Sequence, residues 1–257
     1  MTAPRSIVIT GASSGIGAAL ALRLAGSGTH IALVGRDIGR LATVADACRG
    51  QGAVCQTGAI DIGDSAAMSA FLQQIDRQEP IDLLIANAGI LDGRRADQVV
   101  EEAAATRRVI ETNLLATLDT VHHVLPGMRQ RRNGTIVLVA SLASLVPLPD
   151  APAYSASKAG LLSYGIALRD SVAAEGVRVV VACPGFVATA MGQKHLGPRP
   201  GEITAEQAAD IILRGIRANR AIIGFPLVPF WLSRLSLLAP EWLRRRGMRG
   251  TRFHVGP

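Results

Sequence analysis

TGASSGIG, at residues 10–17, is the stretch that decides the fold of this 257-residue chain. It comes directly after the apolar run Ser6–Thr10, which is typical of a strand, and it opens the helical stretch Gly15–Ala25. Its three glycines let the backbone turn tightly and approach a pyrophosphate, while a helix N-terminus supplies free N–H groups and a partial positive charge. A glycine-rich turn alone is a weak signal, but its place between a strand and a helix favours nucleotide binding.

Short apolar runs alternate with longer helical stretches up to about residue 223. Strands that are apolar throughout predict a sheet buried on both faces. The alternation predicts a doubly wound parallel α/β sheet of about seven strands, with helices on both faces. We expect one domain over residues 1–223 and an apolar, basic C-terminal extension over residues 224–257. The predicted strands are Ser6–Thr10, His30–Val34, Ala53–Thr57, Ile81–Ala86, Thr135–Ala140, Val177–Ala182 and Ala221–Ile223, and the predicted helices are Gly15–Ala25, Asp37–Arg49, Ser65–Arg77, Ala96–His123, Ala151–Glu175 and Ala205–Ala218.

The composition is that of a globular protein. Hydrophobic residues make up 49% and charged residues 18%, which argues against disorder and allows a sizeable core. The three cysteines form no metal-like spacing, so we expect no metal site, and their odd number fits a reducing cytoplasm. The N-terminus is too short before its first motif to be read as a signal peptide.

The net charge of +7 is concentrated towards the C-terminus. From Ile211 onward there are nine arginines and one acid, Glu241, which gives +8, whereas the rest of the chain carries 18 basic and 19 acidic residues, which gives −1. The basic residues lie in an apolar segment without a recognisable binding module, so we expect no nucleic-acid partner.

Tyr154 and Lys158 are four residues apart in YSASK, so on a helix they share one face. A cation about 4 Å from a phenol favours the phenolate by about 4 kcal/mol at an effective dielectric of about 20. That corresponds to roughly three pKa units, enough to bring the phenol into the working range of an acid or base. Ser141, at the end of an apolar run, could hold a substrate oxygen beside the phenol. For this spacing alone, an ordinary surface tyrosine and lysine is the commoner interpretation.

The second predicted strand indicates which dinucleotide is bound. An acid at its end would bind the ribose 2′-hydroxyl of NAD, but Gly35 stands there. Arg36 follows, and a guanidinium can bind a 2′-phosphate with two hydrogen bonds, so we predict NADP(H) over NAD(H). Asp37 could neutralise Arg36 or cap the next helix, and Ser14 offers no second positive charge.

Together these residues resemble the short-chain dehydrogenase/reductase family from about Ser6 to Ala190. The resemblance implies a Rossmann-like fold, hydride transfer between a nicotinamide and a carbonyl or secondary alcohol, a small-molecule substrate, and a homodimer or homotetramer. Ala86 stands where many members have a first asparagine, which puts only local packing in doubt. The motifs are TGASSGIG at 10–17, Asp61 after the third strand, ANAG at 86–89, Asn113 in ETNLLATL, Ser141, YSASK at 154–158 and PGFVAT at 184–189.

The resemblance also implies roles for single residues. Tyr154 would transfer the proton, Ser141 would hydrogen-bond the reacting oxygen, and Lys158 would keep Tyr154 acidic and bind the nicotinamide ribose. Asn113 would bend its helix and hold a water against Lys158, or it could be an interior polar residue with a backbone contact. The expected cofactor-binding residues are Gly11, Ser13, Ser14, Gly15, Ile16, Gly17, Arg36, Asp61, Ile62, Asn87, Ala88, Gly89, Tyr154, Lys158, Pro184, Gly185, Val187 and Thr189.

Three interpretations of the extension remain open: it packs onto the enzyme body, where it closes the pocket or forms a subunit contact, it makes a peripheral membrane contact, or it is mobile. The segment between Pro229 and Pro240 is far shorter than the roughly 20 residues of a membrane-spanning helix. A membrane contact or a lengthened pocket would favour a hydrophobic substrate, such as a 3-oxo lipid. The aromatic and aliphatic residues Phe230, Trp231, Leu235 and Leu238 recur at helical spacing, and Arg244, Arg245, Arg246 and Arg249 follow them.

Two further alternatives concern activity and the pocket. A non-catalytic regulator that senses NADP(H) would not need Ser141, Tyr154, Lys158 and Asn113 together, and isomerase or dehydratase chemistry is not excluded by fold. Residues 192–201 (GQKHLGPRPG) are typical of a loop, which is either a lid over the pocket or a plain surface loop.

Overall fold

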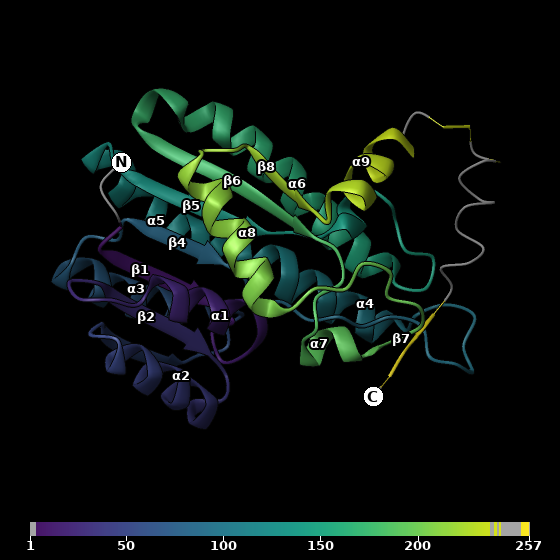
Figure 1. The fold of residues 1–257 in the computed structure, drawn as a ribbon, viewed down its shortest axis with the longest axis horizontal. Helices are drawn as coiled ribbons and strands as arrows, with labels where there is room; N and C mark the ends of the chain where they lie inside the picture. The colour runs from purple at the N-terminus through teal and green to yellow at the C-terminus, as the bar shows by residue number, and fades with distance from the viewer. Residues whose placement is uncertain (1–3, 237–238, 241, 243–252, 257) are drawn as a thin grey trace.

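A computed structural model of the chain describes residues 4–236, 239–240, 242 and 253–256. Its central sheet has seven parallel strands in the order β3-β2-β1-β4-β5-β6-β8 (Figure 1). The direction in which successive strands are added to the sheet reverses between β1 and β4. Sheets of this kind usually bind their ligands in the crevice at that point, outside the carboxyl ends of the strands. The strands are β1 Ser6–Thr10, β2 His30–Gly35, β3 Val54–Ala59, β4 Leu83–Ala86, β5 Gly134–Val139, β6 Val177–Pro184 and β8 Ile222–Phe225.

Helices cover both faces of the sheet (Figure 1). Successive residues of a strand point to opposite faces, so Ile7 and Ile9 of β1 join one core and Val8 joins the other. The first core includes buried residues of α1, α2 and α8, and the second those of α3, α5 and α6. The helices are α1 Gly15–Leu24, α2 Ile38–Gly50, α3 Ser65–Gln78, α4 Ala103–Ile110, α5 Ala116–Arg131, α6 Pro152–Val172, α7 Ala190–Gln193, α8 Ala205–Arg217 and α9 Leu227–Ser236.

The seven-stranded α/β fold expected from the sequence is confirmed, but the fourth predicted helix has different ends. It begins at Ala103 rather than Ala96, and it continues through a π-helical turn, Glu111–Leu115, to the end of α5. Side chains hold the preceding segment in an irregular path: the Arg94 guanidinium donates to Asp150 Oδ1 and Phe253 O. These bonds connect it to a distant part of the chain, which no local pattern predicts.

The described parts of the C-terminal extension pack onto the body. The boundary expected after residue 223 falls inside β8, because Gly224 and Phe225 pair with Cys183 and Pro184 of β6. β9 (His254–Val255) pairs antiparallel with β7 (His195–Leu196). Buried Phe230 joins the second core, and Phe253 and Val255 pack against Ala151, Leu91, Leu148 and Tyr154.

Part of the predicted extension lies outside the described residues, namely Leu238 and the arginines Arg244, Arg245, Arg246 and Arg249. Among the helices that the structure does describe, none has both the length and the apolar composition that crossing a bilayer requires.

Candidate active site

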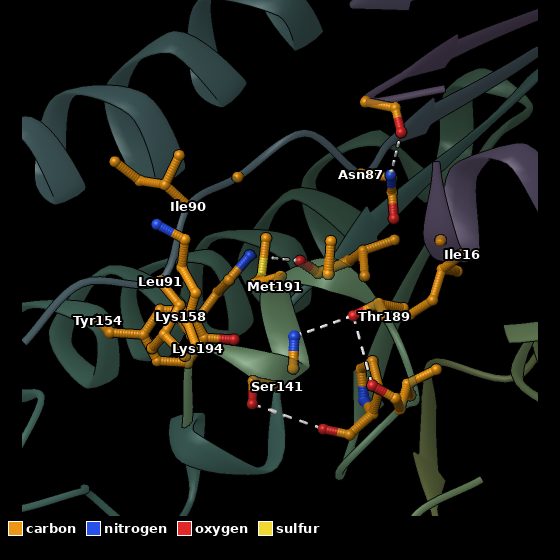
Figure 2. Close-up of a pocket in the computed structure, with 18 of the residues that line it drawn as sticks. Ile16, Asn87, Ile90, Leu91, Ser141, Tyr154, Lys158, Thr189, Met191 and Lys194 are labelled. Carbon is orange, nitrogen blue, oxygen red and sulfur yellow. Dashed lines mark hydrogen bonds between the residues drawn. The ribbon is translucent and has the colours of Figure 1, made fainter. Parts of the chain in front are cut away.

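A cavity of about 750 Å³ opens at the carboxyl ends of the parallel strands. This volume lies within the range of about 300–1,000 Å³ that is usual for ligand pockets. The cavity joins the glycine-rich turn before α1 to the Tyr154–Lys158 pair of α6 (Figure 2). Every predicted catalytic or cofactor residue lines it except Gly17 and Asn113, which lie against the lining residues Gly11 and Gly89.

The glycine-rich turn has the geometry of an anion cradle. Gly11 and Gly15 adopt φ of 66° and 56°, which side chains rarely allow. A Cβ atom on Gly17 would lie 2.3 Å from Gly11 O, so only glycine fits there. Ser14 is the N-cap of α1 but makes no side-chain capping bond. The first N–H groups of α1 therefore remain available to a pyrophosphate, and the site fits a dinucleotide.

Asn87 braces this turn from the neighbouring strand β4. Its Nδ2 donates to Thr10 O at 3.1 Å and to Gly11 O at 3.2 Å, and its backbone N–H donates to Thr10 Oγ1. Ala88 N also donates to Thr10 Oγ1, which fixes the two strand ends against each other. The motif at residues 86–89 therefore holds the glycine turn in shape.

Arginines gather where the second strand meets the cavity. Asp37 caps α2, since its carboxylate accepts from the backbone N of Arg40 at 3.0 Å and from Arg40 Nε at 2.7 Å. The contact of Arg36 is with Asp61, at 3.8 Å between two exposed side chains, and such a pair contributes little. Of the two roles left open for Asp37, the structure shows the cap. Arg36 and Arg40 both line the cavity.

Tyr154 and Lys158 project from α6 to the cavity beside Ser141 (Figure 2). Burial raises the pKa of Tyr154, and a hydrogen bond with the Ser141 hydroxyl partly lowers it. Lys158 Nζ lies 5.8 Å from the Tyr154 ring centre and donates to Val139 O at 2.9 Å. Burial lowers the pKa of Lys158 to about 8. The pair shares one helix face, as its spacing predicts, and the ammonium is held by the carbonyl of Val139.

Asn113 lies in the π-helical turn between α4 and α5 and is fully buried. Its Oδ1 accepts from Ile90 N at 2.7 Å, and its Nδ2 donates to Ile90 O at 2.9 Å and to Ser157 Oγ at 3.2 Å. A Cβ atom on Gly89 would approach both Asn113 Oδ1 and Lys158 Nζ, at 3.1 and 3.4 Å. Asn113 thus sits in a π-helical turn and faces the lysine across a glycine.

The family model for short chain dehydrogenases matches residues 5–198, well over half of the chain. The chain belongs to the short-chain dehydrogenase family. It is therefore an NAD(P)-dependent oxidoreductase that acts on alcohol and carbonyl groups.

Relatives extend the similarity over nearly the whole of this short-chain dehydrogenase. An uncharacterised oxidoreductase of Myxococcus xanthus is 33% identical over 92% of the chain and 93% of its own length. A 3-dehydrosphinganine reductase of Arabidopsis thaliana is 30% identical over 93% of the chain and 76% of its own length. A solved short-chain dehydrogenase from Sphingobium yanoikuyae, in complex with NADPH, is 26% identical, with a TM-score of 0.79 over 96% of each chain.

The end of β6 and the turn after it form the other wall of the dehydrogenase's cavity. Thr189 caps α7, because its Oγ1 accepts from Gly192 N at 3.0 Å and donates to Val187 O at 3.3 Å (Figure 2). Thr189 also lies beside the glycine-rich turn, since a Cβ atom on Gly15 would lie 2.9 Å from Thr189 Cγ2. The two halves of the expected cofactor site therefore meet.

The far end of the cavity is formed by residues that the sequence did not predict as site residues. The loop at 192–201, for which a lid was one alternative, lines the cavity, and so does the start of the C-terminal extension. His195 is buried against Phe253, with ring centres 3.9 Å apart, and its Nε2 has no hydrogen-bond partner in the described part of the chain. The lining residues not predicted as site residues include Arg40, Phe186, Met191, Lys194, His195, Pro198, Pro200, Pro226, Pro229 and Ser233.

Proposed function

We propose that this enzyme transfers a hydride between NADP(H) and the carbonyl or secondary alcohol of a hydrophobic, lipid-like substrate. The observation that carries the proposal is the single cavity that brings the glycine cradle, the arginines after β2 and the Tyr154–Lys158–Ser141 group together. A non-catalytic sensor of NADP(H) would need only the first two of these features. Their combination with a partly buried phenol and a buried ammonium favours an enzyme.

The preference for NADP(H) is supported by charge at the end of β2. The Asp37 carboxylate is held by α2, so it does not cancel Arg36. Arg36 then offers its guanidinium to a 2′-phosphate, with Arg40 paired to Asp37 beside it, whereas Gly35 leaves no acid for a 2′-hydroxyl. The other residues predicted to bind the cofactor would hold the rest of the dinucleotide.

In the proposed mechanism the bound nicotinamide supplies the hydride for the carbonyl carbon. Tyr154 donates its proton to the carbonyl oxygen, and the Ser141 hydroxyl donates a hydrogen bond to it. The raised pKa of Tyr154 keeps the phenol protonated at neutral pH, which is the form that reduction requires. Lys158 supplies positive charge nearby, and Asn113 positions the helix bend from which a water can return protons to Lys158.

A hydrophobic substrate is supported by the lining of the cavity beyond Tyr154. The name of the Arabidopsis relative, a 3-dehydrosphinganine reductase, points to a lipid carbonyl compound. The few polar groups here include Ser233, Lys194 and His195. The apolar residues are Ile90, Leu91, Leu142, Val146, Leu148, Phe186, Met191, Pro198, Pro200, Pro226 and Pro229.

We also propose that the enzyme is a homodimer or homotetramer in the cytoplasm. Exposed apolar side chains support pairing through the long helices: Leu115 lies in the π-helical turn and Ile166 lies on α6. Light scattering at micromolar protein concentration tests this, and a monomeric mass contradicts it.

Purified enzyme with NADPH and a panel of ketones of increasing alkyl length tests the proposed reaction. We expect NADPH to be consumed in a one-to-one ratio with alcohol formed, and kcat/KM to rise with chain length. Tight binding of NADPH without turnover on any ketone would favour the sensor instead. Turnover confined to short polar ketones would refute the proposed hydrophobic substrate but not the proposed reaction.

A further inference from the structure

Helix α9 has one face in the protein and one face in solvent. Phe230 is buried in the second core, while Pro229 and Ser233 line the cavity. In Figure 1 the helix follows directly on β8. Its outer face carries five large apolar side chains, each 56–69% exposed: Leu227, Val228, Trp231, Leu232 and Leu235.

These five residues form a continuous stripe. Positions three, four and eight residues apart on a helix lie on the same side, and 227, 228, 231, 232 and 235 follow that spacing. Soluble proteins expose single apolar residues freely, but a contiguous patch usually marks an interaction site. A tryptophan within such a patch is typical of the boundary between lipid and water.

The charge of α9 and of the sequence after it is mainly positive. Arg234 is exposed on α9, with its guanidinium carbon 5.9 Å from the ring centres of Phe230 and Trp231. Helix α9 contains no acidic residue. From residue 227 onward the sequence has six arginines and one acid, so the segment carries 6 − 1 = +5 of the net charge of +7. A surface that is apolar and basic matches an anionic lipid leaflet.

A second copy of the chain is a poorer occupant of this surface. Symmetric pairing through α9 would bring two segments of charge +5 together, whereas an anionic leaflet attracts each of them. The ten residues of α9 extend 10 × 1.5 Å, about 15 Å, which is half of the roughly 30 Å hydrocarbon core. A contact with lipid therefore stays at the membrane surface.

We infer that α9 docks the enzyme on an anionic membrane surface. The apolar stripe enters the boundary of the leaflet, and Arg234 contacts the lipid headgroups. Since the opposite side of α9 lines the cavity, docking brings the substrate end close to lipid. That last consequence depends on the proposed hydrophobic substrate, whereas docking itself does not.

Co-sedimentation with vesicles tests docking without any substrate. One set of vesicles contains phosphatidylglycerol and phosphatidylcholine, and the other contains phosphatidylcholine alone. We expect the full chain to bind the first set, and to bind it at least tenfold more weakly in about 1 M salt, where the Debye length is about 3 Å. W231S/L235S is expected to bind at least tenfold more weakly at low salt, because it removes apolar area from the stripe.

The control is V99S/V100S, which changes two apolar residues outside the stripe that are even more exposed, and it should bind as the unchanged protein does. Tight NADPH binding by both variants shows that each is folded. Absence of binding to anionic vesicles, or unchanged binding by W231S/L235S, overturns the inference. A lower mass of W231S/L235S by light scattering, with no vesicle binding by the full chain, assigns the stripe to a second copy and also overturns it.

Discussion

Lys158 Nζ lies 5.8 Å from the centre of the Tyr154 ring, and its hydrogen bond goes to Val139 O rather than to the phenol. The two side chains therefore influence each other through space and not by direct contact. Burial keeps the Tyr154 proton in place, and the same burial makes the charge on Lys158 costly. The site therefore holds a protonated phenol next to an ammonium whose charge is destabilised by burial.

Replacement of Tyr154 by phenylalanine tests the proton donor. We expect Tyr154→Phe to lower kcat at least about a hundredfold, the lower end of general acid contributions, with little change in the Kd for NADPH. The chain has two tyrosines, and the other, Tyr164, has its hydroxyl 3.3 Å from His122 Nε2. Tyr164→Phe is therefore the control, and near-normal turnover by Tyr154→Phe would rule out this proton path.

The buried ammonium of Lys158 should make the free energy of unfolding depend on pH. A pKa of about 8, against 10.5 for the ordinary group, means that the unfolded chain binds the proton more tightly. With respect to Lys158, the protein is therefore most stable above pH 10.5, where this residue is neutral in both the folded and the unfolded chain. This part of the free energy of unfolding decreases as the pH falls, and the loss is complete once the pH has passed below about 8. At pH 7 the loss is on the order of 3 kcal/mol, at 1.36 kcal/mol per pKa unit.

Lys158→Met removes this dependence, so the variant should be more stable than the unchanged protein at pH 7 although it loses activity. The difference in the free energy of unfolding should shrink between pH 8 and 10. Urea denaturation of both proteins without cofactor, across that range, measures it. A variant that is less stable at pH 7 would show that the hydrogen bond to Val139 outweighs the cost of burial.

Removal of Arg36 tests the choice of cofactor. Hydrogen bonds to charged groups contribute about 1.5–3 kcal/mol, so Arg36→Ala should lower kcat/KM with NADPH by roughly 10- to 150-fold. With NADH the value should change little, because no 2′-phosphate is present. Arg217→Ala, at an exposed position of α8 outside the cavity lining, is the control. Equal losses with both cofactors would refute the assignment of Arg36 to the phosphate.

Two glycine substitutions test the cradle. A Cβ atom on Gly17 would lie 2.3 Å from Gly11 O, so Gly17→Ala must displace the turn, and we expect NADPH binding to weaken more than tenfold. Gly26→Ala is the matched control, since a Cβ atom there meets no atom within 4 Å. Titration of cofactor fluorescence compares the two variants. If Gly17→Ala binds as tightly as Gly26→Ala, the turn does not hold the pyrophosphate.

The strands and the glycine turn were predictable because their signals are local. An apolar run such as Ile31–Val34 can be buried on both faces only within a covered sheet. The order of the motifs along the chain then indicates the Rossmann-like fold. The π-helical turn at Asn113 was predictable only as a bend, through the family resemblance. The irregular segment before α4 was not, since Arg94 and Arg95 bond to backbone carbonyls about 160 residues further on.

The far end of the cavity escaped prediction for the same reason. His195 pairs with Val255 in a two-stranded sheet, and two residues are too few to form a pattern in the sequence. The basic, apolar composition of the extension was visible in the sequence. The sequence did not predict that Pro229 and Ser233 would line the cavity while Trp231 faced outward. A helix of ten residues, interrupted by proline, gives no clear orientation before it is packed.

The pairing of β7 with β9 has a practical consequence for protein engineering. Exchanging residues 192–201 with those of another family member would leave Val255 facing a foreign strand, and exchanging the last part of the chain would do the same to His195. The two segments therefore form one exchangeable unit, although almost sixty positions separate them. Chimeras meant to transplant substrate selectivity should carry both pieces from the same parent.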